Sequence, residues 1–279
     1  MRWREQRESS NIEDRRGLSG RHIAIGGGGL GTIIIIIVAL LCGKDPRTFL
    51  EQLPDASDAQ TQSQAAPQND EMKKFVASIL GSTEDAWTDI FKHNGATYRD
   101  PKLVLYSDAV RSACGNNSSS TGPFYCPGDE RLYLDTSFFQ ELKTKFKAPG
   151  DFAEAYVIAH EVGHHVQNLL GTMDKVVQAQ SRGGKVQANQ YSVRLELQAD
   201  CYAGIWAKYA QAKGLVETGD IEEALNAASA VGDDQIQRRA QGYVVPDSFT
   251  HGSARDRMSW FSQGFKTGDM RQCNTFGAK

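Results

Sequence analysis

The segment AHEVGHH, residues 159–165, holds the side chains of this sequence that are best suited to metal chemistry. On a helix, positions i and i+4 project from one face, so His160 and His164 can offer two imidazole nitrogens to one ion. Glu161 points about 100° away from His160 and can reach a water molecule on the ion rather than the ion itself. Two rigidly held ligands, an open position for water and a carboxylate base are what zinc-dependent hydrolysis needs. We therefore predict a zinc site with Glu161 as its general base.

A third metal ligand has to come from another element of the chain. The next long helical segment, residues 192–212, carries Glu196 and Asp200, again at positions i and i+4. Glu196 can complete a site of two histidines and one glutamate, and Asp200 can accept the other ring N–H of a zinc-binding histidine, which fixes its tautomer. Taken alone, the pair also fits a solvated helix face. The upstream histidines favour the interpretation as a ligand and its support.

Two further histidines have weaker claims to a role in the site. His165 faces a different direction from His164, and we predict a structural or surface role for it. His251 stands in a loop just before Ser253, which with Asp256 fits the N-cap of another helix. Amide hydrolysis benefits from a second electrophile opposite the metal, and His251 is a candidate for it. Structural hydrogen bonding is the alternative for this residue.

The sequence carries, in this order, the blocks HEVGHHVQNLLG, LELQADCYAGIWA, AASAVGDDQIQ and THGSARDRMSWFSQGF. Through these four blocks the chain resembles the neutral zinc metallopeptidase family of bacterial membrane-anchored proteins, which lies within the wider Glu-zincin group. The resemblance implies a zincin-like domain in which His160, His164 and Glu196 bind zinc. It also implies Glu161 as the catalytic base, Asp200 as a support behind the ligands, and a protein or peptide substrate that it does not identify.

The patterning around these residues predicts an α+β domain that is mainly α. Asp70 and Ser82 fit helix N-caps, which predicts two helices over residues 72–80 and 84–93. Aromatic and branched residues gather in three short segments, residues 102–107, 122–126 and 131–135. The sequence PGDE between the last two segments is typical of a turn. We expect a small antiparallel sheet, with an extended peptide substrate beside one of its edges.

Helical periodicity continues from the sheet nearly to the end of the chain. It predicts a buried helix over residues 151–170, with Gly171 as its stop, and an amphipathic helix over residues 220–241. Inside the second helix, Asp233 and Asp234 fit either a cation site or a helix cap, and the cap is favoured.

Residues 22–43 are predicted to form a transmembrane anchor. The run between Ile23 and Gly43 has no charged residue, is apolar on every helical face and is long enough for the ~30 Å hydrocarbon core. The polar start of the chain and the lack of a small-residue cleavage site disfavour a cleaved signal peptide, and Cys42 lacks the small neighbour expected of a lipidated cysteine. Six arginines precede the run and only Lys44 and Arg47 closely follow it, which places the N-terminus in the cytoplasm.

The predicted organisation is a cytoplasmic tail over residues 1–21, the anchor, a flexible stalk over residues 44–69 and a zinc metallopeptidase-like domain over residues 70–279, periplasmic or extracellular. The cysteines fit an exported domain. Cys114 and Cys126 flank a polar loop and are candidates for a disulfide, which leaves Cys201 and Cys273 as a second pair. Cys201 also fits an ordinary buried thiol.

Charge excludes one class of partner. A net charge of −3, from 31 Lys and Arg against 34 Asp and Glu, provides no basic excess for nucleic acid. One alternative to a peptidase is a membrane-tethered assembly protein that binds zinc without turnover. Glu161 speaks against it, because a structural zinc site uses a fourth protein ligand and no adjacent base. Hydrolysis of a non-peptide amide or of cell-wall peptide bridges is a further alternative.

Overall fold

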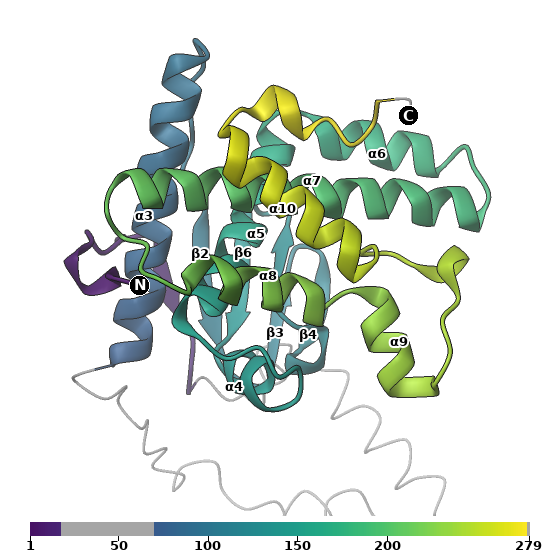
Figure 1. Ribbon diagram of the computed structural model, residues 1–279, viewed down its shortest axis with the longest axis horizontal. Coiled ribbons are helices and arrows are strands. Elements are labelled where there is room, and N and C mark those ends of the chain that lie inside the picture. Colours follow the sequence, from purple (N-terminus) through teal and green to yellow (C-terminus); the bar gives the residue numbers. More distant parts are fainter. Residues whose placement is uncertain (18–69, 278–279) are drawn as a thin grey trace, which may run out of the picture.

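The computed structural model describes residues 1–17 and 70–277 (Figure 1). The predicted anchor and stalk, residues 22–43 and 44–69, lie outside the described residues. Within the two described ranges, no helix has both the length and the apolar character that a membrane crossing requires.

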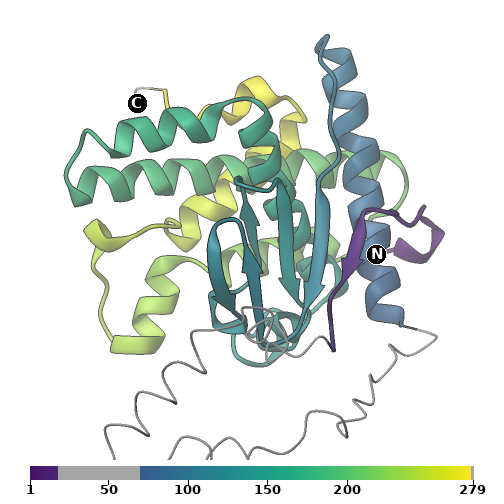
Figure 2. The ribbon, with the colours of Figure 1, turned by 180° about the vertical axis from the view of Figure 1, so that it is seen from behind.

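Helices make up most of the body, and they lie against one face of a small sheet (Figures 1 and 2). The α-helices are α3 (Glu71–His93), α4 (Ser137–Thr144), α5 (Asp151–Leu169), α6 (Thr172–Gln180), α7 (Lys185–Ala212), α8 (Asp220–Ala230), α9 (Asp233–Gln241) and α10 (Ala254–Thr267). Short 3-10 turns are η1 (Trp3–Glu5), η3 (Ser119–Thr121), η4 (Pro246–Ser248) and η5 (Met270–Cys273). The prediction of an α+β fold that is mainly α is confirmed.

The sheet is mixed rather than antiparallel, so that part of the prediction was wrong. Its strand order is β1 (Ile12–Asp14), β2 (Lys102–Tyr106), β6 (Arg131–Asp135) and β5 (Phe124–Cys126). Strands β1, β2 and β6 are parallel, and only β5 runs antiparallel to β6, across the predicted PGDE turn. The reason is that the chain leaves β2 through a separate hairpin, β3 (Ala109–Ser112) and β4 (Gly115–Ser118), before it returns to the sheet.

Residues 1–17 belong to the same body as the rest of the described chain, whereas the sequence predicted a separate tail over residues 1–21. Strand β1 pairs with β2, and the indole of Trp3 is 7% exposed and packs edge-on against Phe75 of α3. Gly81 of α3 makes room for this segment, because a Cβ at that position would lie 2.4 Å from the Arg7 carbonyl oxygen. The sequence prediction missed this packing because it considered only the arginines of this segment, as charges that flank the apolar run.

The α-ammonium of Met1 anchors the start of this segment near the first turn of α5. It donates to Asp151 at 2.9 Å and to Asp220 at 3.4 Å, and Glu217 lies 3.2 Å away. Asp151 and Asp220, with Glu223, are also close enough together to hold a metal ion. In the structure the ammonium group provides the positive charge for this acidic cluster.

Two predicted helix boundaries differ from the structure. Helix α3 runs unbroken through Ser82, which is buried and accepts a hydrogen bond from the indole N–H of Trp206 instead of capping a helix. Conversely, residues 220–241 form two helices, α8 and α9, because the chain turns at Gly232. A Cβ on Gly232 would lie 2.4 Å from the backbone nitrogen of Ala254, so this turn depends on glycine. The predicted caps at Asp70 and Ser253 are confirmed.

Helix α5 lies in the middle of the core, between the sheet and helices α7, α8 and α10 (Figure 1). Its residues from Phe152 to Gln167 are buried, apart from the half-buried Glu154. It ends as predicted, with Gly171 in the left-handed conformation at φ 68°. The central position of α5 makes its orientation dependent on the whole fold.

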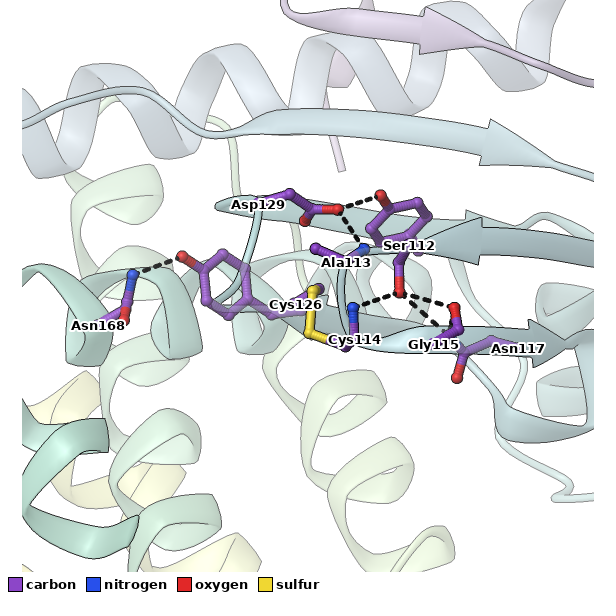
Figure 3. Close-up of a disulfide and its surroundings, with 10 residues drawn as sticks. Ser112, Ala113, Cys114, Gly115, Asn117, Cys126, Asp129 and Asn168 are labelled. Carbon is purple, nitrogen blue, oxygen red and sulfur yellow. Dashed lines mark hydrogen bonds between the residues drawn. A yellow bond between two sulfur atoms is a disulfide. The ribbon is translucent and has the colours of Figure 1, made fainter. Parts of the chain in front are cut away.

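Both predicted cysteine pairs form disulfides in the structure. The Cys114–Cys126 bond links the β3–β4 hairpin to the end of β5, the edge strand of the sheet (Figure 3). Tyr125, next to Cys126, accepts a hydrogen bond from Asn168 near the end of α5. The Cys201–Cys273 bond joins α7 to η5.

Candidate metal centre

Helices α5 and α7 cross closely, and the crossing brings the predicted ligands together. Gly163 of α5 lies against α7, where a Cβ on it would be 3.0 Å from the Ala199 carbonyl oxygen. The Glu196 carboxylate consequently lies between the two histidines, 3.1 Å from His160 Nε2 and 3.3 Å from His164 Nε2. One donor atom from each of the three residues lies within 4.8 Å of the others.

Each ligand histidine is held from behind through its Nδ1 atom. Asp200 accepts from His160 Nδ1 at 2.8 Å, and the side-chain oxygen of Gln167 lies 2.9 Å from His164 Nδ1. With Nδ1 bonded in this way, Nε2 is the ring atom that faces Glu196 and would carry the lone pair offered to a metal ion. The support by Asp200 was predicted. Gln167 was not, although its position three residues after His164 on a buried helix was a usable signal.

The donor set fits a zinc ion. Two imidazole nitrogens and one carboxylate oxygen are ligands that zinc binds readily, and three protein ligands with one open position are typical of catalytic zinc sites. Burial alone would lower the pKa of His160, but Asp200 and Glu196 outweigh it and raise that pKa to about 10. Burial would likewise raise the pKa of Glu196, yet the two histidines hold it well below its usual value. The site therefore stabilises positive charge at the point where the three side chains meet.

Arg257 of α10 and Tyr156 of α5 complete a buried network around Asp200. Arg257 donates to both carboxylate oxygens of Asp200, from Nε at 2.8 Å and from Nη2 at 3.0 Å. The Tyr156 hydroxyl donates to the same carboxylate at 2.5 Å. The sequence prediction missed Arg257, although Ala254, Arg257 and Phe261 share the spacing of one buried helix face. A charged residue on such a face is expected to have a buried partner.

Glu161 lies beside the three ligands and lines the same open cleft. Its side chain is almost buried, and among the residues that the structure describes none makes a hydrogen bond to its carboxylate. Asp200, by contrast, is fully buried and its carboxylate accepts four hydrogen bonds, from Tyr156, His160 and Arg257. Glu161 is thus the carboxylate at this site that is placed to exchange a proton with a molecule in the cleft.

The cleft has a volume of about 560 Å³ and is walled by elements far apart in the sequence. One wall contains the chain from η3 through the start of β5, residues 119–125. Apolar side chains line other parts of it, beside the polar residues of the site: Phe138, Phe146, Val157, Met173, Leu195, Val231 and Ile236. This combination fits a ligand that offers both a polar backbone and apolar side chains.

The two remaining histidines of interest have different surroundings. His165 is fully buried, with Nε2 donating to the Arg99 carbonyl oxygen at 2.7 Å and Nδ1 3.1 Å from the Tyr125 hydroxyl. It holds the sheet against α5, as its predicted structural role requires. His251 lines the cleft, and its side chain is 52% exposed.

An HExxH helix in the core, a glutamate from the next long helix beside both histidines and an open cleft are features typical of the zinc metallopeptidase class. The chain belongs to the family described as "Putative neutral zinc metallopeptidase", whose model matches residues 1–276. The match includes residues 1–17, in keeping with their place in the fold.

Two bacterial proteins are similar to this chain over most of its length. The chain is 50% identical over 285 residues to a protein of Escherichia coli K12 that carries the name "Uncharacterized protein YpfJ", with 99% of each chain covered. It is 43% identical over 260 residues to "Uncharacterized protein Rv2575" of Mycobacterium tuberculosis H37Rv, covering 86% of this chain and 85% of the relative. No solved structure was found to match the chain.

Proposed function

We propose that this protein is a zinc-dependent metallopeptidase that hydrolyses peptide bonds, with Glu161 as the general base. The observation that carries the proposal is the position of the Glu161 carboxylate, free of hydrogen bonds from the described residues and in one cleft with His160, His164 and Glu196. A structural zinc site has no use for such a group.

The chain's own residues divide the work of hydrolysis among them. His160, His164 and Glu196 would hold the ion, while Asp200 and Gln167 keep the imidazoles in the metal-binding tautomer. A zinc ion held there supplies Lewis acidity, which makes water more acidic and polarises a carbonyl group. Glu161 accepts a proton from the attacking water and passes it to the leaving amine.

The edge of the sheet supports a peptide as the substrate. Strand β5 is the last strand of the sheet order, and residues at its start line the cleft. An extended peptide beside this edge would form main-chain hydrogen bonds with β5. We therefore expect only a weak preference for particular side chains of the substrate. The same arrangement suits peptide bridges of a cell wall, which makes panels of protein and peptidoglycan fragments the way to separate the two substrate classes.

The test compares full-length wild type with Glu161→Gln at matched zinc content. The substrate is a fluorescein-labelled unfolded casein, and Glu222→Gln, an exposed glutamate of α8, is the matched control. We expect Glu161→Gln to lose roughly 10²- to 10⁴-fold in kcat, the usual contribution of a general base, while the control keeps its rate. Equal inactivity of wild type and variant, both with zinc bound, would favour the alternative of a catalytically silent zinc-binding protein.

We also propose that residues 22–43 attach the protein to the cell membrane with the body in the periplasm or outside the cell. A single crossing would also put residues 1–21 on the cytoplasmic side, which conflicts with the packing of residues 1–17 against α3 and β2 of the body. A membrane-impermeant maleimide applied to whole cells tests it, with single cysteines at the exposed positions Glu8 and Glu222. A single crossing lets only Glu222→Cys react, whereas a body that includes residues 1–17 requires both positions to react alike.

A further inference from the structure

A chain of side-chain amides runs behind His164, from helix α5 through α7 to the turn η5. The Gln167 oxygen lies 2.9 Å from His164 Nδ1, and Gln167 Nε2 donates to Gln198 Oε1 at 3.1 Å. Gln198 Nε2 in turn donates to the Cys273 carbonyl oxygen at 2.9 Å. All four residues are buried, so the bonds of this chain are shielded from exchange with water.

Backbone carbonyl groups set the direction of the amide chain. A carbonyl oxygen can only accept, so Gln198 turns its N–H₂ group toward Cys273 and its oxygen toward Gln167. A second carbonyl group, that of Leu195, accepts from Gln167 Nε2 at 2.7 Å. Both contacts turn the nitrogen of Gln167 away from His164 and its oxygen toward the ring. The acceptor at His164 Nδ1 is therefore fixed by groups that cannot exchange their roles.

The two candidate ligand histidines are supported by different chemical groups. The partner of His160 Nδ1 is the carboxylate of Asp200, which is paired with Arg257. The partner of His164 Nδ1 is the neutral amide of Gln167. A charged acceptor binds an N–H group strongly by itself, whereas a neutral amide is strengthened by the hydrogen bonds that it donates in turn. The support of His164 consequently depends on what lies beyond Gln167.

Attachment of η5 to α7 does not account for Gln198. Cys201 follows Gln198 at position i+3, on the same face of α7, and it is joined to Cys273 by a disulfide. The carbonyl group of Cys273 is thus held beside α7 by a covalent bond. What Gln198 adds is an acceptor, anchored at η5, for the second N–H of Gln167.

We infer that Gln198 is a positioning residue for the metal centre. It holds the Gln167 amide so that the amide oxygen accepts from His164 Nδ1–H, which leaves the lone pair of His164 Nε2 for a zinc ion. A firmly held acceptor on the far side of an imidazole increases its affinity for a metal ion. The inference rests on the zinc site of the proposed function and on no step of hydrolysis.

The experiment is a double-mutant cycle on the full-length chain, with Gln198→Met, Gln167→Met and the combined variant. Methionine has nearly the length of glutamine but no amide group. Competition with a chromophoric chelator gives the Kd for zinc. Long-range proton–nitrogen NMR spectra show which nitrogen of each histidine ring carries the proton, and the ring that changes in Gln167→Met is that of His164. Gln190→Met, the same change at an exposed glutamine of α7, is the matched control.

We expect zinc-bound wild type to carry a proton on His164 Nδ1 that exchanges slowly with water. Gln167→Met should weaken zinc binding by roughly 10- to 100-fold, as loss of a ligand's direct partner does. Gln198→Met should weaken it by about 5- to 10-fold and speed the exchange of that proton, because the Gln167 acceptor remains but is held less firmly. In the Gln167→Met background, Gln198→Met should change the Kd by less than about 2-fold, because the two residues act in series. Gln190→Met should match wild type.

Three results would overturn the inference: no proton on His164 Nδ1 in zinc-bound wild type, a wild-type Kd in Gln198→Met, or the same loss from Gln198→Met with and without Gln167. The first needs no variant, and Gln198→Leu, which also removes both amide bonds, replaces Gln198→Met if that variant does not fold. If wild type binds zinc and cleaves casein while Gln198→Met keeps its zinc affinity, only this inference fails. If wild type binds zinc but cleaves nothing, the proposed function fails, and the Kd values still decide the role of Gln198.

Discussion

Replacement of Asp200 by asparagine tests how strongly the metal centre is tied to the fold. Asp200 is fully buried and accepts hydrogen bonds from His160, Tyr156 and Arg257, the last of which is 4% exposed. Asparagine has nearly the same shape, but it has one accepting oxygen and no charge. Either amide orientation places an N–H₂ group against a donor, and the buried guanidinium loses its counterion.

The expected cost follows from the burial of the pair. Removal of one partner from a buried ion pair destabilises a protein by about 3–5 kcal/mol, since the other charge stays buried without compensation. We expect that loss for Asp200→Asn in denaturant unfolding of the zinc-free protein with its disulfides intact. Zinc affinity should also fall, by roughly 10- to 100-fold, because His160 loses the acceptor that fixes its tautomer.

Two further variants test whether the loss of stability in Asp200→Asn comes from the unpaired charge of Arg257. Asp247→Asn, the same change at an exposed aspartate of η4, should cost no more than about 0.5 kcal/mol. Arg257→Met added to Asp200→Asn should restore part of the lost stability, because it removes the uncompensated charge. A loss below about 1 kcal/mol in Asp200→Asn, or strict additivity in the double variant, would refute this account of the network.

Two further predictions concern the helix that carries the histidines and the segment packed beside it. Burial, with the charges of Asp151 and Glu223, raises the pKa of Glu154 to about 7. The folded state therefore holds this proton more tightly than the unfolded state, and the free energy of unfolding falls as pH rises from about 4.5 to about 7. Glu154→Gln should remove that fall, and it should be more stable than wild type by about 2 kcal/mol at about pH 8, with little difference at about pH 4. If the stability curves of variant and wild type run parallel against pH, Glu154 is not the group that titrates. Trp3→Ala should cost about 3 kcal/mol in denaturant unfolding, because the indole is buried against Phe75. A cost near zero would mean that residues 1–17 are not part of the core.

Local sequence was sufficient for the parts of the site that lie within one helix. The spacing of His160, Glu161 and His164 sets their directions once the segment is helical, and the same holds for Glu196 and Asp200. The caps at Asp70 and Ser253 could be predicted for the same reason, because a cap depends on backbone groups only three residues away. The polar loop between Cys114 and Cys126 indicated the first disulfide, whereas Cys201–Cys273 was only the remaining pair, and the structure decided against a buried thiol at Cys201.

Predictions failed where an element's partner is distant in the chain. The direction of β2 relative to β6 depends on the path of the chain between them, and periodicity within a strand does not contain that information. Helix α3 continues through Ser82, and the Ser82 hydroxyl accepts a hydrogen bond from the Trp206 indole, 124 residues away in the sequence. The break at Gly232 depends on the close approach of Ala254.

The sequence by itself determined the side chains available for chemistry: two histidines and a glutamate on one helix and two carboxylates on another, in a spacing typical of the zinc metallopeptidase class. Only the tertiary structure decided which further groups serve it. Arg257 reaches Asp200, and Gln198 reaches Gln167, because helices separated in sequence pack together at glycine contacts. The physical reason is that hydrogen bonds act over about 3 Å, so a residue's partner is set by the packing of the whole chain and not by its neighbours in sequence.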